Sequence, residues 1–474
     1  MPTADPRVPQ HVVHNDEPDY HPNKDHFGQQ SLIESIAEIV GIRAAPPFVA
    51  SLNGDWGQGK TSVLEAVYQQ MTGVKPADYT GQKPQPDYAH VRVVWFDAWR
   101  YQHDPTPIVA LLNEIRKQLE KMSRLAHYKE KGKKTAQIAV ESSLQSLASL
   151  TSGLLGAGGG DNIVETVKKN GHAWEQRNHS YALPSQTIRE LLNKAISDIL
   201  ARLIPGNNDK RRLVVIIDDL DRCQPIVAYR LLEGLKIFLN LPSCTFLIGC
   251  NRSEVVRAIS VGLHTESGIP IDAENKCHAE EYFEKICSYS WDIPFPTPRE
   301  SAWYLGILLD GSSGDLEPAL HKAIKAVLSR VEGRILPANP RRIKSYANTL
   351  IRLAGNSKNH PKIDFDTAEE AAFLLTLTYI VAFMPDLHRH ILANPLALRE
   401  LNMKASDIHL FGEGFPEQAV LPEDSPIRKA IPTPDELRYL PPESTEKLRM
   451  ASLLAYTAVP TDALIEKYLP HALR

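Results

Sequence analysis

The chain has 474 residues, and its 53 lysines and arginines against 57 aspartates and glutamates give a formal net charge of -4. This balance argues against a general attraction to nucleic acid, and the length predicts about two or three domains. The five cysteines form no Cys-x-x-Cys pair, which argues against a disulfide framework and a zinc site. The N-terminus lacks a basic segment followed by an apolar run, so we expect a cytoplasmic protein.

The pattern along the first 300 residues predicts an α/β fold. Residues 1–24 contain five prolines among polar residues and are expected to form an N-terminal arm. Short apolar runs that predict strands follow at 48–52, 91–96, 213–217, 245–250 and 289–293. Because these runs are continuously apolar and separated by helical stretches, they predict a largely parallel sheet sandwiched by helices.

The composition and element patterns predict how the chain after the arm divides into domains. We expect a nucleotide-binding core over 25–296 with a helical insertion at about 105–200, a helical domain over 297–420, and a proline-rich segment with terminal helices over 421–474. Within the insertion, the Ser/Gly-rich segment 136–160 raises a membrane-spanning helix as an alternative, but its hydroxyl groups and glycines disfavour insertion into hydrocarbon. The uncharged run 371–384 is short for a membrane span and predicts a buried core helix.

A glycine-rich segment lies between the first predicted strand and the helix expected after it. It reads Gly54-Asp55-Trp56-Gly57-Gln58-Gly59-Lys60-Thr61 and is followed by Ser62. Glycines let such a loop curl until its amide groups point at phosphates, beside the positive end of the next helix. Lys60 would neutralise the outer phosphates, and the Thr61 hydroxyl would bind Mg²⁺. The segment therefore predicts a binding site for a nucleoside triphosphate and Mg²⁺, with residues 54–62 around the nucleotide.

Two carboxylates follow the third predicted strand. At the C-terminal edge of a parallel sheet, Asp218 is placed to hold Mg²⁺, and Asp219 is placed to orient or deprotonate an attacking water. The alternative is an acidic turn after a core strand. Asn251, which follows the fourth strand, could sense the terminal phosphate or cap the helix that starts near residue 253.

A group of cations follows Asn339-Pro340. This dipeptide is typical of a helix start, with Asn339 as the cap and Pro340 in the first turn. Arg341 is the candidate that would reach the phosphates from this helix and couple hydrolysis to a change of shape. A solvated basic helix face is the alternative.

Taken together, these motifs resemble the KAP family of P-loop NTPases over about residues 16–353. The most specific match is Asp218-Asp219-Leu220-Asp221-Arg222-Cys223, and the tryptophan-containing phosphate loop and Phe96-Asp97-Ala98-Trp99-Arg100-Tyr101 also match. The resemblance implies roles for Asp221 and Arg222. It also implies a nucleotide-driven switch on partner proteins, often within phage-defence gene sets of prokaryotes.

Two features depart from the family pattern. Where family members often carry paired membrane helices between the two nucleotide motifs, this chain has the Ser/Gly-rich segment 136–160, and we expect no membrane span. The sensor position, which is often acidic in the family, is Asn251.

The sequence leaves three classes of function open. The leading hypothesis is a magnesium-dependent ATPase that acts as a switch within a complex of several proteins; a homo-oligomer stays open. The alternative is a nucleotide-stabilised assembly scaffold with little hydrolysis. The third hypothesis, an enzyme stimulated by nucleic acid, is supported only by the lysine cluster within 128–135. A run of solvated surface lysines is the simpler interpretation of this cluster. We expect ATP because the Asn-Lys-x-Asp guanine signature is missing from the sequence.

Overall fold

The computed structural model describes residues 14–15, 27–104, 106–129, 184–204, 206, 211–238, 241–268, 270–311, 316–330, 336–356 and 367–395, with 397, 398, 401, 426, 464, 465, 467 and 468. The chain divides into two compact units, Pro18–Pro294 and Met1–Glu17 with Phe295–Arg474. Most of the predicted arm, the Ser/Gly-rich segment 136–160, the lysine cluster beyond Lys129 and nearly all of the segment 421–474 lie outside the described residues.

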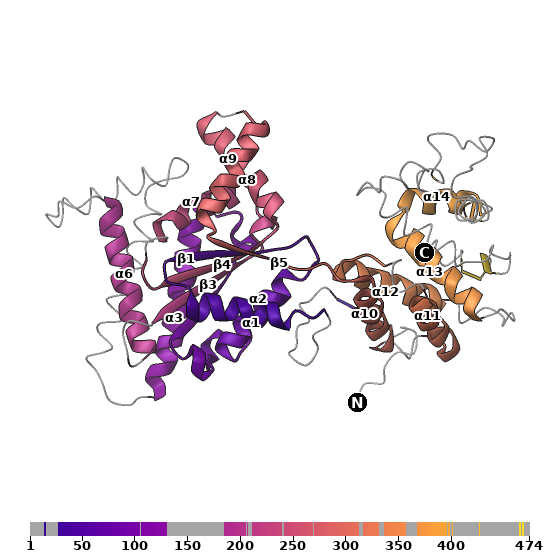
Figure 1. The fold of residues 1–474 in the computed structure, drawn as a ribbon, viewed down its shortest axis with the longest axis horizontal. Helices are drawn as coiled ribbons and strands as arrows, with labels where there is room; N and C mark the ends of the chain where they lie inside the picture. The colour runs from indigo at the N-terminus through magenta and orange to yellow at the C-terminus, as the bar shows by residue number, and fades with distance from the viewer. Residues whose placement is uncertain are drawn as a thin grey trace, which may run out of the picture. The chain divides into compact units, whose positions relative to one another are not determined.

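A five-stranded parallel sheet forms the centre of the unit Pro18–Pro294 (Figure 1). Its strands are β1 (Phe48–Asn53), β2 (Val91–Asp97), β3 (Arg212–Asp218), β4 (Cys244–Cys250) and β5 (Tyr289–Asp292). They lie in the order β2-β3-β4-β1-β5, and every neighbouring pair is parallel. All five predicted strands are confirmed, and so is the predicted α/β fold.

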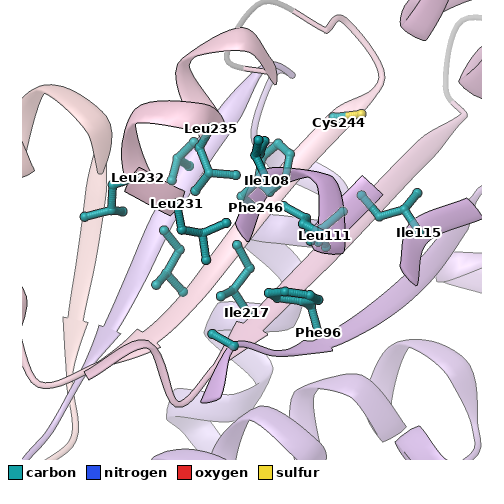
Figure 2. Close-up of a cluster of buried hydrophobic side chains, with 14 of the residues drawn as sticks. Phe96, Ile108, Leu111, Ile115, Ile217, Leu231, Leu232, Leu235, Cys244 and Phe246 are labelled. Carbon is teal, nitrogen blue, oxygen red and sulfur yellow. The ribbon is translucent and has the colours of Figure 1, made fainter. Parts of the chain in front are cut away.

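Helices cover both faces of this sheet. Along β3, Val214 and Ile216 point into the core formed with α1 (Gln30–Glu38) and α2 (Lys60–Thr72). Val215 and Ile217 point into the opposite core, formed with α3 (Pro107–Lys129), α6 (Pro184–Leu203) and α7 (Pro225–Phe238). Figure 2 shows the second core, where Ile217, Phe96 and Phe246 of the strands lie close to leucines and isoleucines of α3 and α7. Alternate side chains of a strand face opposite sides of the sheet. A strand with helices packed on both faces is therefore apolar at consecutive positions. Each such side chain contributes about 1.5–3 kcal/mol when fully buried.

The helical elements of this unit lie before and between the strands along the chain. They are α1 (Gln30–Glu38), the π-helical turn η1 (Ile39–Arg43), α2 (Lys60–Thr72), α3 (Pro107–Lys129), α6 (Pro184–Leu203), α7 (Pro225–Phe238), α8 (Arg252–Ser267) and α9 (Ala273–Ile286). Short 3₁₀ turns are η2 (Pro76–Gly81), η3 (Pro86–Tyr88), η4 (Trp99–Tyr101) and η6 (Leu220–Arg222). Helices α3 and α6 occupy the described parts of the range 105–200, and α8 and α9 form a pair that projects from the sheet (Figure 1).

The second unit is helical where the structure describes it. Its helices are α10 (Pro298–Gly311), α11 (Pro318–Arg330), α12 (Pro340–Asn356), α13 (Thr367–Phe383) and α14 (Pro385–Ala393). The Arg342 amide donates to Asn339 Oδ1 at 3.2 Å, which confirms the predicted cap of α12. The backbone of His14 exchanges two hydrogen bonds of 2.9 Å with the Asn348 side chain, so the N-terminal segment contacts α12 here.

Helix α13 is the predicted core helix. Every residue from Ala371 to Ile380 is buried, because its neighbours cover it on all sides. Among the described helices, none is by itself both long and apolar enough to cross a membrane. Only α13 and α14 taken together meet that criterion, and they are bent by 116° at their junction.

Candidate functional site

Three neighbouring strands end at the edge of the sheet where the predicted site residues lie. β1 leads into Gly54, β3 ends at Asp218, and β4 ends directly before Asn251. β4 lies between the other two strands, and all three run parallel. Open α/β sheets bind ligands at the carboxyl ends of their strands. The fold therefore brings the glycine-rich loop, the acidic Asp218 and the amide of Asn251 to the same edge of the sheet.

The loop between β1 and α2 has the backbone conformations that its glycines were expected to supply. Gly57 and Gly59 have φ values of 82° and 99°, in the left-handed region that favours glycine. The Gly54 amide donates to the Cys250 carbonyl at 3.2 Å, which fastens the start of the loop to the end of β4. Because α2 begins at Lys60, the free amide groups of its first turn add a positive helix end to the loop.

Lys60 is held inside the site by protein groups. Its side chain is only 7% exposed, and its Nζ lies 3.2 Å from Asp221 Oδ2. The same ammonium donates to the Gly54 carbonyl at 2.9 Å and to the Asp55 carbonyl at 3.4 Å. In this structure the cation expected to meet the outer phosphates is thus neutralised by a carboxylate from the β3 side of the site.

Two further loop side chains anchor the loop to its surroundings. Gln58 Oε1 accepts a hydrogen bond of 2.6 Å from the Asp55 amide, and its Nε2 donates to the Ile293 carbonyl at 2.9 Å. Trp56 is 57% exposed, yet its Nε1 donates to Asp221 Oδ2 at 2.8 Å. Gln58 therefore braces the loop against the segment after β5, and Trp56 connects the loop tip to Asp221.

The pair Thr61 and Asp218 was predicted to bind Mg²⁺. Asp218 is 3% exposed and accepts a hydrogen bond from the Thr61 hydroxyl. Its Oδ1 is buried and has no hydrogen-bond partner among the described residues. Burial raises the pKa of Asp218 to about 7, and the charge of Asp219 adds to this effect.

An unpaired buried carboxylate oxygen beside a hydroxyl fits Mg²⁺, which prefers hard oxygen ligands. The described residues contain no cluster of three or more His, Cys, Asp or Glu side chains that could hold a metal. Magnesium sites that also use substrate phosphates need only one or two carboxylates. Ser62, the last residue of the predicted loop, lies half-buried in the first turn of α2.

Asp219 has a left-handed backbone, with φ 56° and ψ 30°, which is uncommon for a residue other than glycine. Its Oδ1 lies 3.0 Å from Arg222 Nε. Burial raises the pKa of Asp219, whereas the charge of Arg222 opposes the shift and the charge of Asp97 adds to it. The guanidinium of Arg222 also lies 5.6 Å from the ring centre of Trp99. The candidate general base is thus paired with a cation that also contacts an aromatic ring.

Asn251 serves as the cap of α8 and also contacts the phosphate loop. Its Oδ1 accepts hydrogen bonds from the amides of Ser253 and Glu254 at 3.1 and 3.4 Å. Its Nδ2 donates to Asp55 Oδ1 at 3.2 Å. The capping role is confirmed, and the contact with Asp55 places Asn251 beside the glycine-rich loop. The sensing role itself stays a prediction.

Arg341 belongs to the unit Phe295–Arg474, where it lies half-buried in the first turn of α12. Its predicted approach to the phosphates stays a prediction.

Asp97 is a site residue outside the set of catalytic and binding residues predicted from the sequence. It ends β2 and is the register partner of Asp218, and its charge contributes to the raised pKa values of Asp218 and Asp219. Its Oδ1 accepts a hydrogen bond of 3.2 Å from the Arg100 amide. The signal was present, because an acidic residue after a predicted apolar strand was the same criterion that selected Asp218.

Comparison with protein families matches residues 29–355 to the KAP family P-loop domain. The phage T7 exclusion protein of Escherichia coli (strain K12) is 21% identical to the chain over 291 residues. That alignment covers 58% of this chain but 34% of the exclusion protein, so the chain spans about a third of its relative's length. The family match includes the loop, the carboxylates after β3, Asn251 and Arg341.

Proposed function

The chain belongs to the KAP family of P-loop domains, and on that premise we propose that it binds ATP with Mg²⁺ and hydrolyses it to drive a conformational switch. The switch acts on partner proteins in a multi-subunit complex. The observation that carries the proposal is the meeting of Lys60, Asp218 and Asp219 at one edge of the sheet, beside the loop 54–59.

Each of these groups has a distinct task in phosphoryl transfer. The loop amides and Lys60 would bind and neutralise the phosphates, while Thr61 and Asp218 would hold Mg²⁺. When bound, Mg²⁺ would supply positive charge next to the transferred phosphoryl group. Asp219 orients the attacking water and takes its proton, a role that suits a carboxylate whose pKa is raised by burial.

The biological setting follows from a relative. The phage T7 exclusion protein is similar to this chain over 291 residues, and on that similarity we place the switch in a prokaryotic antiphage defence complex. We propose adenine as the nucleobase of the bound nucleotide, because the sequence lacks the Asn-Lys-x-Asp signature of guanine-binding proteins.

A second function has an observation in its favour. Lys60 is paired with Asp221, and Asp219 is paired with Arg222, so turnover that uses these groups free of protein partners needs a rearrangement of both pairs. A protein that binds nucleotide but rarely makes this rearrangement would be an assembly scaffold with little hydrolysis. The two functions therefore differ in turnover and share the binding site.

The experiment is phosphate release from ATP and GTP by the purified chain, with and without Mg²⁺. Lys60→Ala serves as the binding-deficient control, and calorimetry measures affinity for both proteins. We expect Mg²⁺-dependent release from ATP that Lys60→Ala abolishes together with binding. The scaffold is favoured if ATP binds tightly but no phosphate is released. This result must hold both for the purified chain and for its complex isolated from the native host. Wild-type affinity in Lys60→Ala contradicts the site itself.

A further inference from the structure

Asp221 connects two parts of the phosphate loop that lie four residues apart. Its Oδ2 receives the Trp56 indole N–H at 2.8 Å and lies 3.2 Å from Lys60 Nζ. The Asp221 side chain is 1% exposed and that of Lys60 is 7% exposed, so this ion pair is almost completely removed from water. One carboxylate oxygen thus holds both the tip of the loop and its cation.

The contacts of Lys60 show why phosphate binding must disturb this arrangement. An ammonium has three donors, and here its neighbours are Asp221 Oδ2 and the carbonyls of Gly54 and Asp55. A phosphate can therefore bind Lys60 only by taking the place of a protein acceptor. Asp221 is the charged member of the three, and it would lie next to the phosphates as a like charge.

From these contacts we propose that Asp221 is a latch that holds the nucleotide-free phosphate loop closed. Nucleotide phosphates compete with Asp221 for Lys60, and the Trp56 indole leaves Asp221 when the latch opens. The inference rests on the proposed function, since it concerns the same nucleotide site. It assigns to Asp221 a role in regulating access to that site.

The surroundings of Asp221 fit a contact that opens and closes. Trp56 is exposed although its N–H is bound, so its ring can move without breaking a packed core. Asp221 Oδ1 is buried and has no hydrogen-bond partner among the described residues, which leaves the carboxylate able to accept another donor when Lys60 departs. The competing hypothesis is that Asp221 stays on Lys60 and presents it to the phosphates.

Affinity decides between the two hypotheses. In the full-length chain, Asp221→Asn removes the charge but keeps the size of the side chain. The latch predicts that this variant binds ATP and inorganic pyrophosphate about tenfold more tightly than wild type, because one charge-assisted contact no longer competes. It also predicts a lower melting temperature for the nucleotide-free variant, since a buried cation loses its partner. Weaker or unchanged binding overturns the latch.

Trp56→Phe provides a milder test if Asp221→Asn does not fold. It keeps a ring at the loop tip and removes only the N–H that reaches Asp221, so we expect affinity to rise two- to fivefold, by the approximate size of one hydrogen bond. Wild type should show a change in tryptophan fluorescence on ATP addition that Trp56→Phe loses. The control Trp303→Phe, in the other unit, should keep that change. Unaltered affinity or an undiminished fluorescence change in Trp56→Phe contradicts the latch.

The result also separates the latch from the proposed function. If Lys60→Ala abolishes binding while Asp221→Asn and Trp56→Phe bind as wild type, only the latch is wrong. If neither wild type nor any variant binds ATP or pyrophosphate, the proposed function fails and the latch fails with it.

Discussion

Arg222 Nε lies 3.0 Å from Asp219 Oδ1, so the carboxylate proposed to activate water is already paired with a cation three residues along the chain. The Arg222 side chain is 35% exposed and lies beside Trp99, so an incoming nucleotide or partner protein can compete for the pair from the Arg222 side. Two measurable consequences follow from this ion pair.

Replacing Asp219 should separate binding from turnover. Asp219→Asn is nearly isosteric and leaves Lys60, Thr61 and Asp218 in place, so we expect ATP affinity within a few-fold of wild type. Hydrolysis should fall by about 10²-fold or more, because the amide cannot accept the proton of water. Single-turnover phosphate release and calorimetry measure the two quantities. Equal loss of binding and hydrolysis would show that Asp219 holds the nucleotide or its metal instead.

Removing the cation should move the pH dependence of hydrolysis. Burial raises the pKa of Asp219, and the charge of Arg222 lowers it. Arg222→Gln therefore raises the pKa of Asp219 further, and a general base that must be ionised then loses activity at a higher pH than in wild type. The acid limb of the pH profile of kcat/KM should shift to higher pH. A shift to lower pH, or none, contradicts the role of Asp219 as the base.

Much of the fold was predictable because its strands obey one simple physical rule. β3 and β4 are buried along their whole length, and their centres, Leu213 to Ile217 and Phe246 to Ile248, are uninterrupted apolar runs without the polar positions of an amphipathic helix. The ends of the runs were predicted to within about a residue. The acidic residues at those ends then followed from the rule that ligands bind beyond the carboxyl ends of parallel strands.

The contacts of Asp221 could not be predicted in this way. It lies 165 residues from Trp56 in the sequence, and no local pattern connects a carboxylate after β3 to a lysine after β1. Family resemblance assigned Asp221 a role without saying which. The left-handed backbone of Asp219 was also hidden, because aspartate carries no sequence signal as strong as glycine for that conformation. Asp97 differs from both, since the rule that selected Asp218 applied to it equally.

The two roles of Asn251 can be separated by substitution. Asn251→Ser keeps an oxygen that caps α8 but loses the amide that donates to Asp55 at 3.2 Å. We expect its free energy of unfolding to stay within about 0.5 kcal/mol of wild type, with ATP hydrolysis lowered about tenfold. Asn251→Ala is the matched control, which should also lose about 1 kcal/mol of stability by uncapping the helix. Normal hydrolysis in the serine variant would leave capping as the sole role.

The buried charge of Asp218 makes a prediction about stability. Its pKa rises from an ordinary value of 3.8 to about 7, chiefly because burial disfavours the charged form. Above pH 7, keeping this carboxylate ionised without Mg²⁺ costs the folded state on the order of 4 kcal/mol. Asp218→Asn removes that cost, so the metal-free variant should be more stable than wild type at pH 8 although it is inactive.

The sign of the effect follows from where protons bind. Below pH 3.8 the carboxyl is protonated in the folded and the unfolded chain, so it contributes the same to both. Between pH 3.8 and about 7 only the folded chain keeps the proton, and wild-type stability falls as the pH rises through this window. The stability advantage of Asp218→Asn should therefore be larger at pH 8 than at pH 5.

Urea denaturation with a metal chelator, followed by tryptophan fluorescence, measures this difference. Of the six tryptophans only Trp303 lies outside the unit Pro18–Pro294, so the signal reports mainly on the unit that holds the site. Asp87→Asn, at an exposed carboxylate, is the matched control and should change stability by less than about 0.5 kcal/mol at either pH. If Asp218→Asn is less stable than wild type at pH 8, the Asp218 carboxylate is stabilised by its surroundings in the absence of metal. The unpaired Oδ1 would then no longer support a site that waits for Mg²⁺.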